Sequence, residues 1–132
     1  MKDGANMKLN PDCVRDILLT IESETDYNSG INFEPKKSEF PLLAKYSPNE
    51  LFYHLRQCDL SAFFYKSTVY LDATYHVRDL TPYAHEFLAN IRSENNWEKV
   101  KSISKKVGSN SLDSIKQIAV GVIGELIKGQ FL

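Results

Sequence analysis

The sequence lacks a strong charge of either sign and a long hydrophobic run. Its 132 residues carry 16 basic and 17 acidic side chains, a formal net charge of −1, so no overall positive field attracts nucleic acid. No apolar run approaches the roughly 18 residues that cross a bilayer. Residues 1–6 also lack the hydrophobic stretch of a secretory signal. We therefore expect a cytoplasmic protein that does not enter membranes.

Cysteine is scarce as well. The two cysteines, Cys13 and Cys58, each lie on the apolar face of a predicted helix, where a thiol behaves as a small buried hydrophobic group. Since there is no secretory signal, the pattern favours two buried free thiols over a disulfide.

Common catalytic and metal-binding motifs are missing too. The chain contains no glycine-rich phosphate loop, nucleophile elbow or paired-carboxylate motif. His54, His76 and His85 have no short metal-ligand spacing between them. His85 and Glu86 are sequence neighbours, so on a helix they point to different sides and do not converge as an acid/base pair. We therefore expect no enzyme activity, no metal and no cofactor.

The N-terminal part of the sequence does contain a clear order of elements. Asn10 is a good N-cap and Pro11 suits a first turn, which predicts a helix over residues 11–23. A polar loop over residues 23–30 precedes a short edge strand at 31–33, and the apolar segment 40–46 indicates a short helix. Residues 1–6 are expected to be a disordered start or a cloning remnant, because Met7 stands just before the patterned sequence.

The strongest start signal is Ser47-Pro48-Asn49-Glu50, which matches a capping box and predicts a helix over residues 48–61. Residues 63–71 and 75–80 are rich in aromatic and β-branched side chains and predict an antiparallel hairpin, with a turn at 72–74. Thr81-Pro82 begins the next helix.

Three helices are predicted after the hairpin. The first runs from Pro82 until Asn95-Asn96 breaks it, the second from Trp97 to Val107, and the third begins after Ser111 and carries a continuous apolar stripe to residue 127. The spacing of Trp97 from its apolar neighbours favours a core position over a binding anchor. The stripe of the last helix fits intramolecular packing and homodimerisation equally well.

This order predicts an α+β, mainly α fold: a winged helix-turn-helix with a small antiparallel hairpin as its wing and two additional C-terminal helices. The expected organisation is a winged-helix domain over residues 7–93, followed by a helical pair over residues 94–132 that packs on it or mediates dimerisation.

Several separated blocks of the sequence resemble an uncharacterised family common in bacteria and their prophages. The likeness is carried by residues 79–92, extended by 95–97, 99–101 and 108–119, and by the blocks 10–19, 53–58 and 80–88, and it extends from Met7 to about Leu126. That family is known only as a domain of unknown function and is related in pattern to the YjcQ-like winged-helix proteins. The resemblance implies a winged-helix fold and a phage-linked context, and it brings no established activity.

Two positions depart from the family pattern, because Ala62 and Ala84 stand where glycine is expected. Ala84 lies inside a helix, where a methyl group is harmless. At Ala62 the turn from helix to strand must either avoid a positive φ angle or accept about 1 kcal/mol of strain.

The winged-helix interpretation also predicts a DNA-binding surface. In this geometry the second helix of the helix-turn-helix enters the major groove, and the hairpin tip contacts the neighbouring backbone or minor groove. Asparagine, glutamine and arginine can make two-point contacts to base edges, and tyrosine can bond a phosphate. The candidate DNA-facing residues are Asn49, Tyr53, His54, Arg56 and Gln57 on the helix, with Lys66 and Arg78 on the hairpin.

Charge argues against strong DNA binding at this surface. Glu50 and Asp59 outweigh Arg56 on the helix, and Asp72 lies near the hairpin tip. Because phosphate neutralisation supplies most non-specific affinity, such a surface would bind weakly or as a dimer. We therefore expect either a DNA-binding accessory or regulatory protein, or a module that binds a host or phage protein, such as an inhibitor of a defence system. The second alternative rests on hairpin aromatics expected to be exposed: Phe64, Tyr65, Tyr70 and Tyr75.

Overall fold

The computed structural model describes residues 7–36 and 40–131. These residues form two compact units, Met1–His85 and Glu86–Leu132. The expectation for residues 1–6 lies outside the described residues. The fold is α+β and mainly helical, with one small antiparallel sheet, as the sequence predicted.

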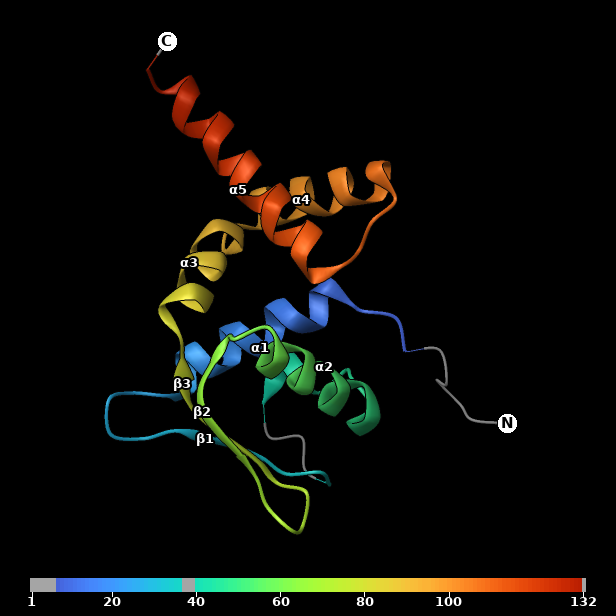
Figure 1. The fold of residues 1–132 in the computed structure, drawn as a ribbon, viewed down its shortest axis with the longest axis vertical. Coiled ribbons are helices and arrows are strands. Elements are labelled where there is room, and N and C mark those ends of the chain that lie inside the picture. The colour runs from blue at the N-terminus through green and yellow to red at the C-terminus, as the bar shows by residue number, and fades with distance from the viewer. Residues whose placement is uncertain (1–6, 37–39, 132) are drawn as a thin grey trace. The chain divides into compact units, whose positions relative to one another are not determined.

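The first unit begins with α1 (Pro11–Glu24) and α2 (Pro48–Leu60), which lie side by side in Figure 1. Asn10 and Ser47 cap them as predicted, because their side-chain oxygens accept hydrogen bonds from the backbone N–H groups of Asp12 and Glu50. The predicted short helix at 40–46 is reduced to a single 3-10 turn, η1 (Pro41–Leu43), which contacts α1.

Three strands complete this unit: β1 (Ile31–Phe33), β2 (Phe64–Val69) and β3 (Tyr75–Leu80). The sheet order is β1-β3-β2, and both pairings are antiparallel. The predicted hairpin is therefore confirmed, and β1 joins its β3 edge. Gly30 lies against β3 so closely that an added Cβ would stand 2.6 Å from the carbonyl oxygen of Val77, which explains why glycine is needed there.

Apolar side chains from α1, η1, α2 and the sheet form the core of the first unit. Both cysteines are buried in it as free thiols, as predicted, and burial raises the pKa of each. The other fully buried large apolar side chains are Ile17, Leu18, Ile21, Phe33, Leu43, Leu55 and Phe63.

α3 (Pro82–Ile91) spans the boundary, and the second unit contains α4 (Glu94–Val107) and α5 (Leu112–Gly129), which pack against each other. The prediction that Asn95-Asn96 breaks the chain between helices is wrong. Ser93 caps α4, its hydroxyl accepts the N–H of Asn96 at 3.2 Å, and both asparagines lie in the first turn of that helix. Trp97 is buried, which confirms its core position.

Candidate nucleic-acid interface

α2 turns a stripe of polar side chains outward. Asn49, Tyr53, Arg56 and Gln57 follow one another at spacings of four, three and one residues, which places them on one side of the helix. Asn49 and Arg56 are exposed, and the other two are partly exposed. The guanidinium carbon of Arg56 lies 5.6 Å from the ring centre of Tyr53. We call these four residues the α2 stripe.

His54 does not belong to this stripe, so the prediction that it faces DNA is wrong. The residue is fully buried. Its Nε2 accepts the backbone N–H of Asn10 at 2.8 Å, and its Nδ1 lies 2.8 Å from the carbonyl oxygen of Glu50, to which it donates. Nε2 therefore binds the segment before α1, and Nδ1 binds the backbone of α2. The spacing from Leu51, Leu55 and Cys58 was the signal for this position, since all four lie on the buried side of α2.

Both acidic residues of α2 make contacts within the fold. Glu50 Oε2 lies 3.3 Å from the side-chain nitrogen of Asn10, so the capping box forms only through Ser47. Asp59 Oδ2 accepts hydrogen bonds from Ser67 at 2.6 Å and from Tyr75 at 2.5 Å. Burial, together with the hydrogen bond to Asp59, raises the pKa of Tyr75. Asp59 thus ties the hairpin to α2, a contact between distant segments that no sequence motif indicated.

A buried carboxylate on α1 holds the turn before α2. Asp16, on α1, accepts a hydrogen bond from the hydroxyl of Tyr46 at 2.6 Å and an ion pair from Lys45 at 3.0 Å, both on the same oxygen. Burial, with the hydrogen bond to Asp16, raises the pKa of Tyr46. These contacts fix where α2 begins relative to α1, and so they orient the α2 stripe.

Lys66 lies in the middle of β2 with an unusual backbone conformation. Its φ angle is 57°, a left-handed value that costs a residue with a Cβ about 1 kcal/mol or more. Pairing with β3 occurs on both sides of it, at Tyr65 with Asp79 and at Ser67 with Val77. The amino group of Lys66 lies 5.4 Å from the ring centre of Tyr65. Local strain of this kind concentrates at functional positions.

Arg78 faces the loop between α1 and β1. Its guanidinium donates hydrogen bonds to the carbonyl oxygens of Asp26 and Tyr27, and the Asp26 carboxylate in turn caps the N–H groups of Asn28 and Ser29. Lys66 and Arg78 come together in a cavity of about 420 Å³. Its described lining residues, none of which belongs to the α2 stripe, are Tyr27, Asn28, Tyr65, Lys66, Arg78 and Asp79.

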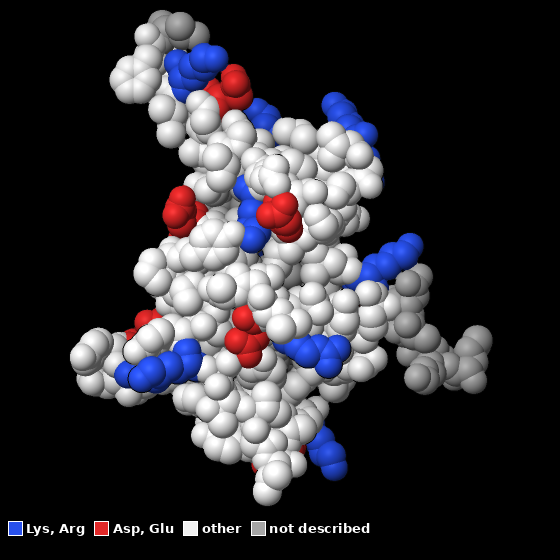
Figure 2. All heavy atoms as spheres, viewed as in Figure 1, with Lys and Arg blue, Asp and Glu red and all other residues white. Residues whose placement is uncertain are grey.

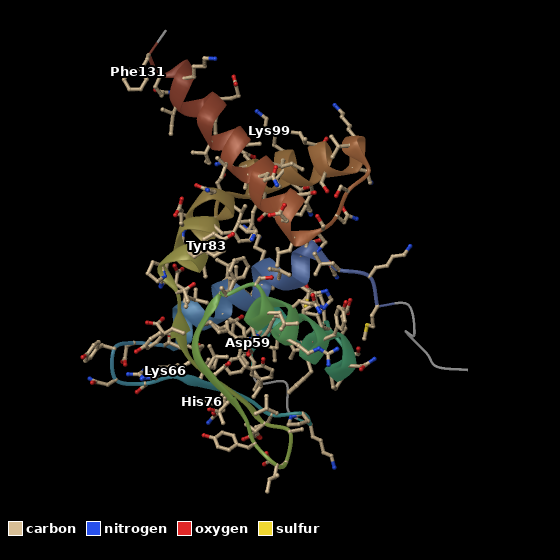
Figure 3. All side chains as sticks on the ribbon, viewed as in Figure 1. Asp59, Lys66, His76, Tyr83, Lys99 and Phe131 are labelled. Atoms are coloured by element: carbon tan, nitrogen blue, oxygen red, sulfur yellow. The ribbon has the colours of Figure 1, made fainter. Side chains whose placement is uncertain are left out.

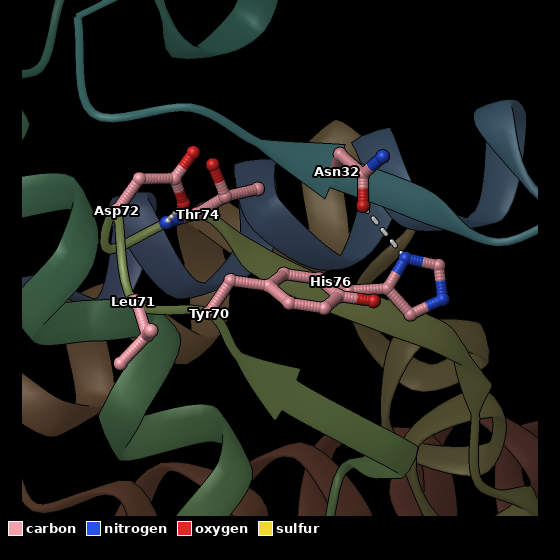
Figure 4. Close-up of a pocket in the computed structure, with 6 residues that line it drawn as sticks. All are labelled: Asn32, Tyr70, Leu71, Asp72, Thr74 and His76. Atoms are coloured by element: carbon pink, nitrogen blue, oxygen red, sulfur yellow. Dashed lines mark hydrogen bonds between the residues drawn. The ribbon is translucent and has the colours of Figure 1, made fainter.

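The hairpin tip carries a pocket that polar and apolar side chains line together. Figure 4 shows its shallow pocket, where Asn32 Oδ1 and His76 Nδ1 lie 2.7 Å apart across β1 and β3. The backbone N–H of Thr74 donates to Asp72, and this bond lowers the pKa of that carboxyl. Leu71 is fully exposed at the turn, beside Tyr70, which is half exposed.

The hairpin aromatics divide into two groups. Tyr65 and Tyr70 are exposed as predicted, whereas Phe64 and Tyr75 are buried, so that part of the prediction is wrong. Tyr75 turns inward because its hydroxyl reaches Asp59, and Phe64 contacts the ring of Tyr75 edge-on, with 6.2 Å between ring centres.

Basic and acidic side chains are interspersed over the face shown in Figure 2, which carries no continuous basic area among the described residues. The labelled Asp59 lies on α2 and the labelled Lys66 on the hairpin (Figure 3).

Among the described residues no cluster of three or more histidine, cysteine or acidic side chains could hold a metal ion. No helix within residues 7–36 and 40–131 is long and apolar enough to span a bilayer. His85 and Asp79 approach to 4.0 Å, both partly exposed.

Comparison with known proteins identifies the family of this chain. Searches of curated proteins and of solved structures find no match. The model of one family, described as hypothetical protein (DUF2513), matches residues 8–110. That match covers most of the chain, from the residues before α1 to the end of α4, and leaves out α5. The chain therefore belongs to the DUF2513 family.

Proposed function

We propose that this protein binds double-stranded DNA weakly, as an accessory or regulatory protein, through the outward face of α2. The observation that carries the proposal is the α2 stripe. Its four polar side chains lie together on a capped helix, and within the described residues they have no hydrogen bond to another side chain. A purely solvated face needs no such concentration of two-point hydrogen-bonding groups.

Each residue of the stripe has a defined role in this proposal. Asn49 and Gln57 carry amides that can pair with an adenine edge, and Arg56 can pair with guanine or bind a phosphate. Tyr53 supplies a hydroxyl for the phosphate backbone, and the guanidinium group of Arg56 lies over its ring. On the hairpin, Lys66 supplies a phosphate contact, while Arg78 holds the loop between α1 and β1.

The small number of cations sets the expected strength. Asp59 and Glu50 remain acidic groups on the same helix, although both bind partners within the fold. Since each phosphate contact contributes to affinity and to the salt dependence through counterion release, few contacts give weak binding with a shallow dependence on salt. The proposed prophage association rests on the sequence resemblance alone.

An electrophoretic mobility shift with random duplex DNA at low salt tests this proposal. We expect a shift that disappears as salt rises, and Arg56→Ala should weaken binding about tenfold. Lys105→Ala is the matched control, because it removes the same charge from an exposed position on α4. Equal binding by wild type and both variants would reject the α2 stripe as the contact surface.

A second candidate is a module that binds a host or phage protein, such as a phage-encoded inhibitor of a defence system. The exposed apolar tip of the hairpin favours it, since Val69, Tyr70 and Leu71 are all at least half exposed. In this case the wild type gives no duplex shift at micromolar concentration in low salt. Leu71→Ser should then abolish capture of the host partner that the wild type retains, without changing the unfolding midpoint.

A further inference from the structure

Lys66 and Arg78 occupy opposite positions on the two strands of the hairpin. The residues on either side of them pair in register, so Lys66 stands directly across from Arg78. Two like charges at opposite positions of an antiparallel pair destabilise that pair. The left-handed φ angle of Lys66 adds backbone strain at the same place. Charge repulsion and backbone strain therefore coincide at one position of the hairpin.

Both cations line the cavity of about 420 Å³ at the hairpin. In Figure 3 Lys66 lies where the loop between α1 and β1 runs beside the hairpin. Among the described residues neither Lys66 nor Arg78 forms an ion pair with a carboxylate. Asp79 also lines the cavity, but its Oδ1 accepts the N–H of Leu80 at 2.7 Å and lies 4.0 Å from Nε2 of His85. The cavity thus has an excess of positive charge, although the whole chain carries a net charge of −1.

The loop between α1 and β1 holds the guanidinium of Arg78 in place. Two of its nitrogens donate to the carbonyl oxygens of Asp26 and Tyr27. The loop is itself fixed, because the Asp26 carboxylate accepts the N–H groups of Asn28 and Ser29 at 2.8 Å each. A guanidinium has five N–H groups, so three remain to bind an anion. Donors that are already oriented lower the entropy cost of binding.

Two tyrosine rings border the same cavity. Tyr27 is 90 % exposed and Tyr65 is 50 % exposed, and the amino group of Lys66 lies 5.4 Å from the ring centre of Tyr65. Exposed aromatic rings beside cations stack with nucleobases while the cations bind phosphate. The cavity volume lies in the range of about 300–1,000 Å³ that small-molecule sites occupy. Charge, rings and size together suit one phosphorylated nucleoside.

We infer that this cavity binds a nucleoside monophosphate, with the phosphate group between Lys66 and Arg78 and the base stacked on Tyr65. A terminal phosphate carries a charge of about −1.5 to −2 at pH 7, which matches two cations better than the single charge of a phosphate within a DNA strand. The inference does not rest on DNA binding through α2, since no residue of the α2 stripe is among the described lining residues. Only Lys66 is shared with that proposal.

Titration calorimetry of the full chain at low salt, without DNA, tests the site. The probes are adenosine 5′-monophosphate (AMP), adenosine and inorganic phosphate. We expect one AMP to bind per chain, at least about tenfold more tightly than adenosine or phosphate alone, because only AMP engages both the cations and the ring. No binding at about 1 mM AMP, or AMP binding no tighter than phosphate, overturns the inference.

Three variants test the assigned contacts. Lys66→Met removes the charge and keeps the length of the side chain, so it should raise the Kd for AMP about tenfold. Tyr65→Ala should raise the Kd for AMP and leave that for phosphate unchanged. Lys105→Met is the matched control, because it removes the same charge from an exposed position on α4. Thermal unfolding checks that each variant folds, and a folded Lys66→Met that binds AMP like the wild type overturns the inference.

Discussion

Ala62 and Gly108 hold the same left-handed backbone conformation at the ends of two helices, with φ angles of 63° and 73°. After α2, the N–H groups of Ala62 and Phe63 bond back to the carbonyls of Asp59 and Cys58. After α4, the N–H groups of Gly108 and Ser109 bond in the same pattern to Lys105 and Ser104. Both ends are Schellman motifs, and only the second has the glycine that suits this position.

Exchanging these residues should therefore change stability in opposite directions. Ala62→Gly should raise the free energy of unfolding by about 1 kcal/mol, because it removes the clash of the Cβ in the left-handed region. Gly108→Ala should lower it by about 1 kcal/mol through backbone strain alone, since an added Cβ meets no other atom within 4 Å. Urea unfolding of both variants measures the two changes. A loss of stability in Ala62→Gly would contradict the assigned conformation.

At Gly30 a side chain is excluded by lack of space and not by the backbone φ angle. Gly30→Ala should lower the free energy of unfolding by about 2–3 kcal/mol, because the new methyl would overlap the Val77 carbonyl and the ring of His76. Gly129→Ala is the control, since its Cβ would meet no atom within 4 Å. Chemical denaturation measures both. Similar effects of the two variants would show that β1 does not lie against β3 in solution as described.

Stability should also fall at alkaline pH. Burial raises the folded-state pKa of Tyr46 and Tyr75 above the value of about 10 for an unfolded chain. Above that pH the unfolded state loses protons that the folded state keeps, so stability present below pH 10 is lost as pH rises. Each tyrosine contributes at most about 1.4 kcal/mol per pH unit, less where solvent screens it.

Denaturation across alkaline pH tests this sign. Tyr75→Phe should flatten the fall in stability, although it costs about 1 kcal/mol at neutral pH by removing the bond to Asp59. The exposed Tyr27→Phe serves as the control and should leave the slope unchanged. Buried Cys13 and Cys58 act in the same direction, because burial raises their pKa as well. If the free energy of unfolding fell equally steeply with pH in wild type and Tyr75→Phe, the buried position of Tyr75 would be contradicted.

Local signals in the sequence were enough to predict most of the fold. The caps at Asn10 and Ser47 and the turn between the hairpin strands each depend on a few neighbouring residues, so they could be read directly. Side-chain exposure was harder to predict. His54 is buried because the backbone of Asn10, 44 residues away, supplies a hydrogen-bond partner, and Tyr75 is buried because Asp59 does the same.

The candidate site depends even more on such distant contacts. Asn49 and Arg56 could be placed from helical spacing alone, and the structure leaves both exposed. By contrast, β2 lacks a simple alternation of apolar and polar residues, so sequence could not show which of Phe64 and Tyr65 faces inward. No sequence signal indicates the positive φ angle of Lys66, because lysine rarely adopts a left-handed backbone conformation.

Lys66 therefore offers a test that separates stability from binding. Lys66→Gly relieves the left-handed strain and should raise the free energy of unfolding by about 0.5–1 kcal/mol. It also removes the proposed phosphate contact, so DNA affinity should fall and its dependence on salt should weaken by about one counterion. Lys66→Ala keeps the strain and removes the charge, so it should bind as weakly as Lys66→Gly without the gain in stability. Undiminished DNA binding by both variants would exclude Lys66 from the contact surface, whereas unequal binding would show that the strained backbone itself positions the hairpin.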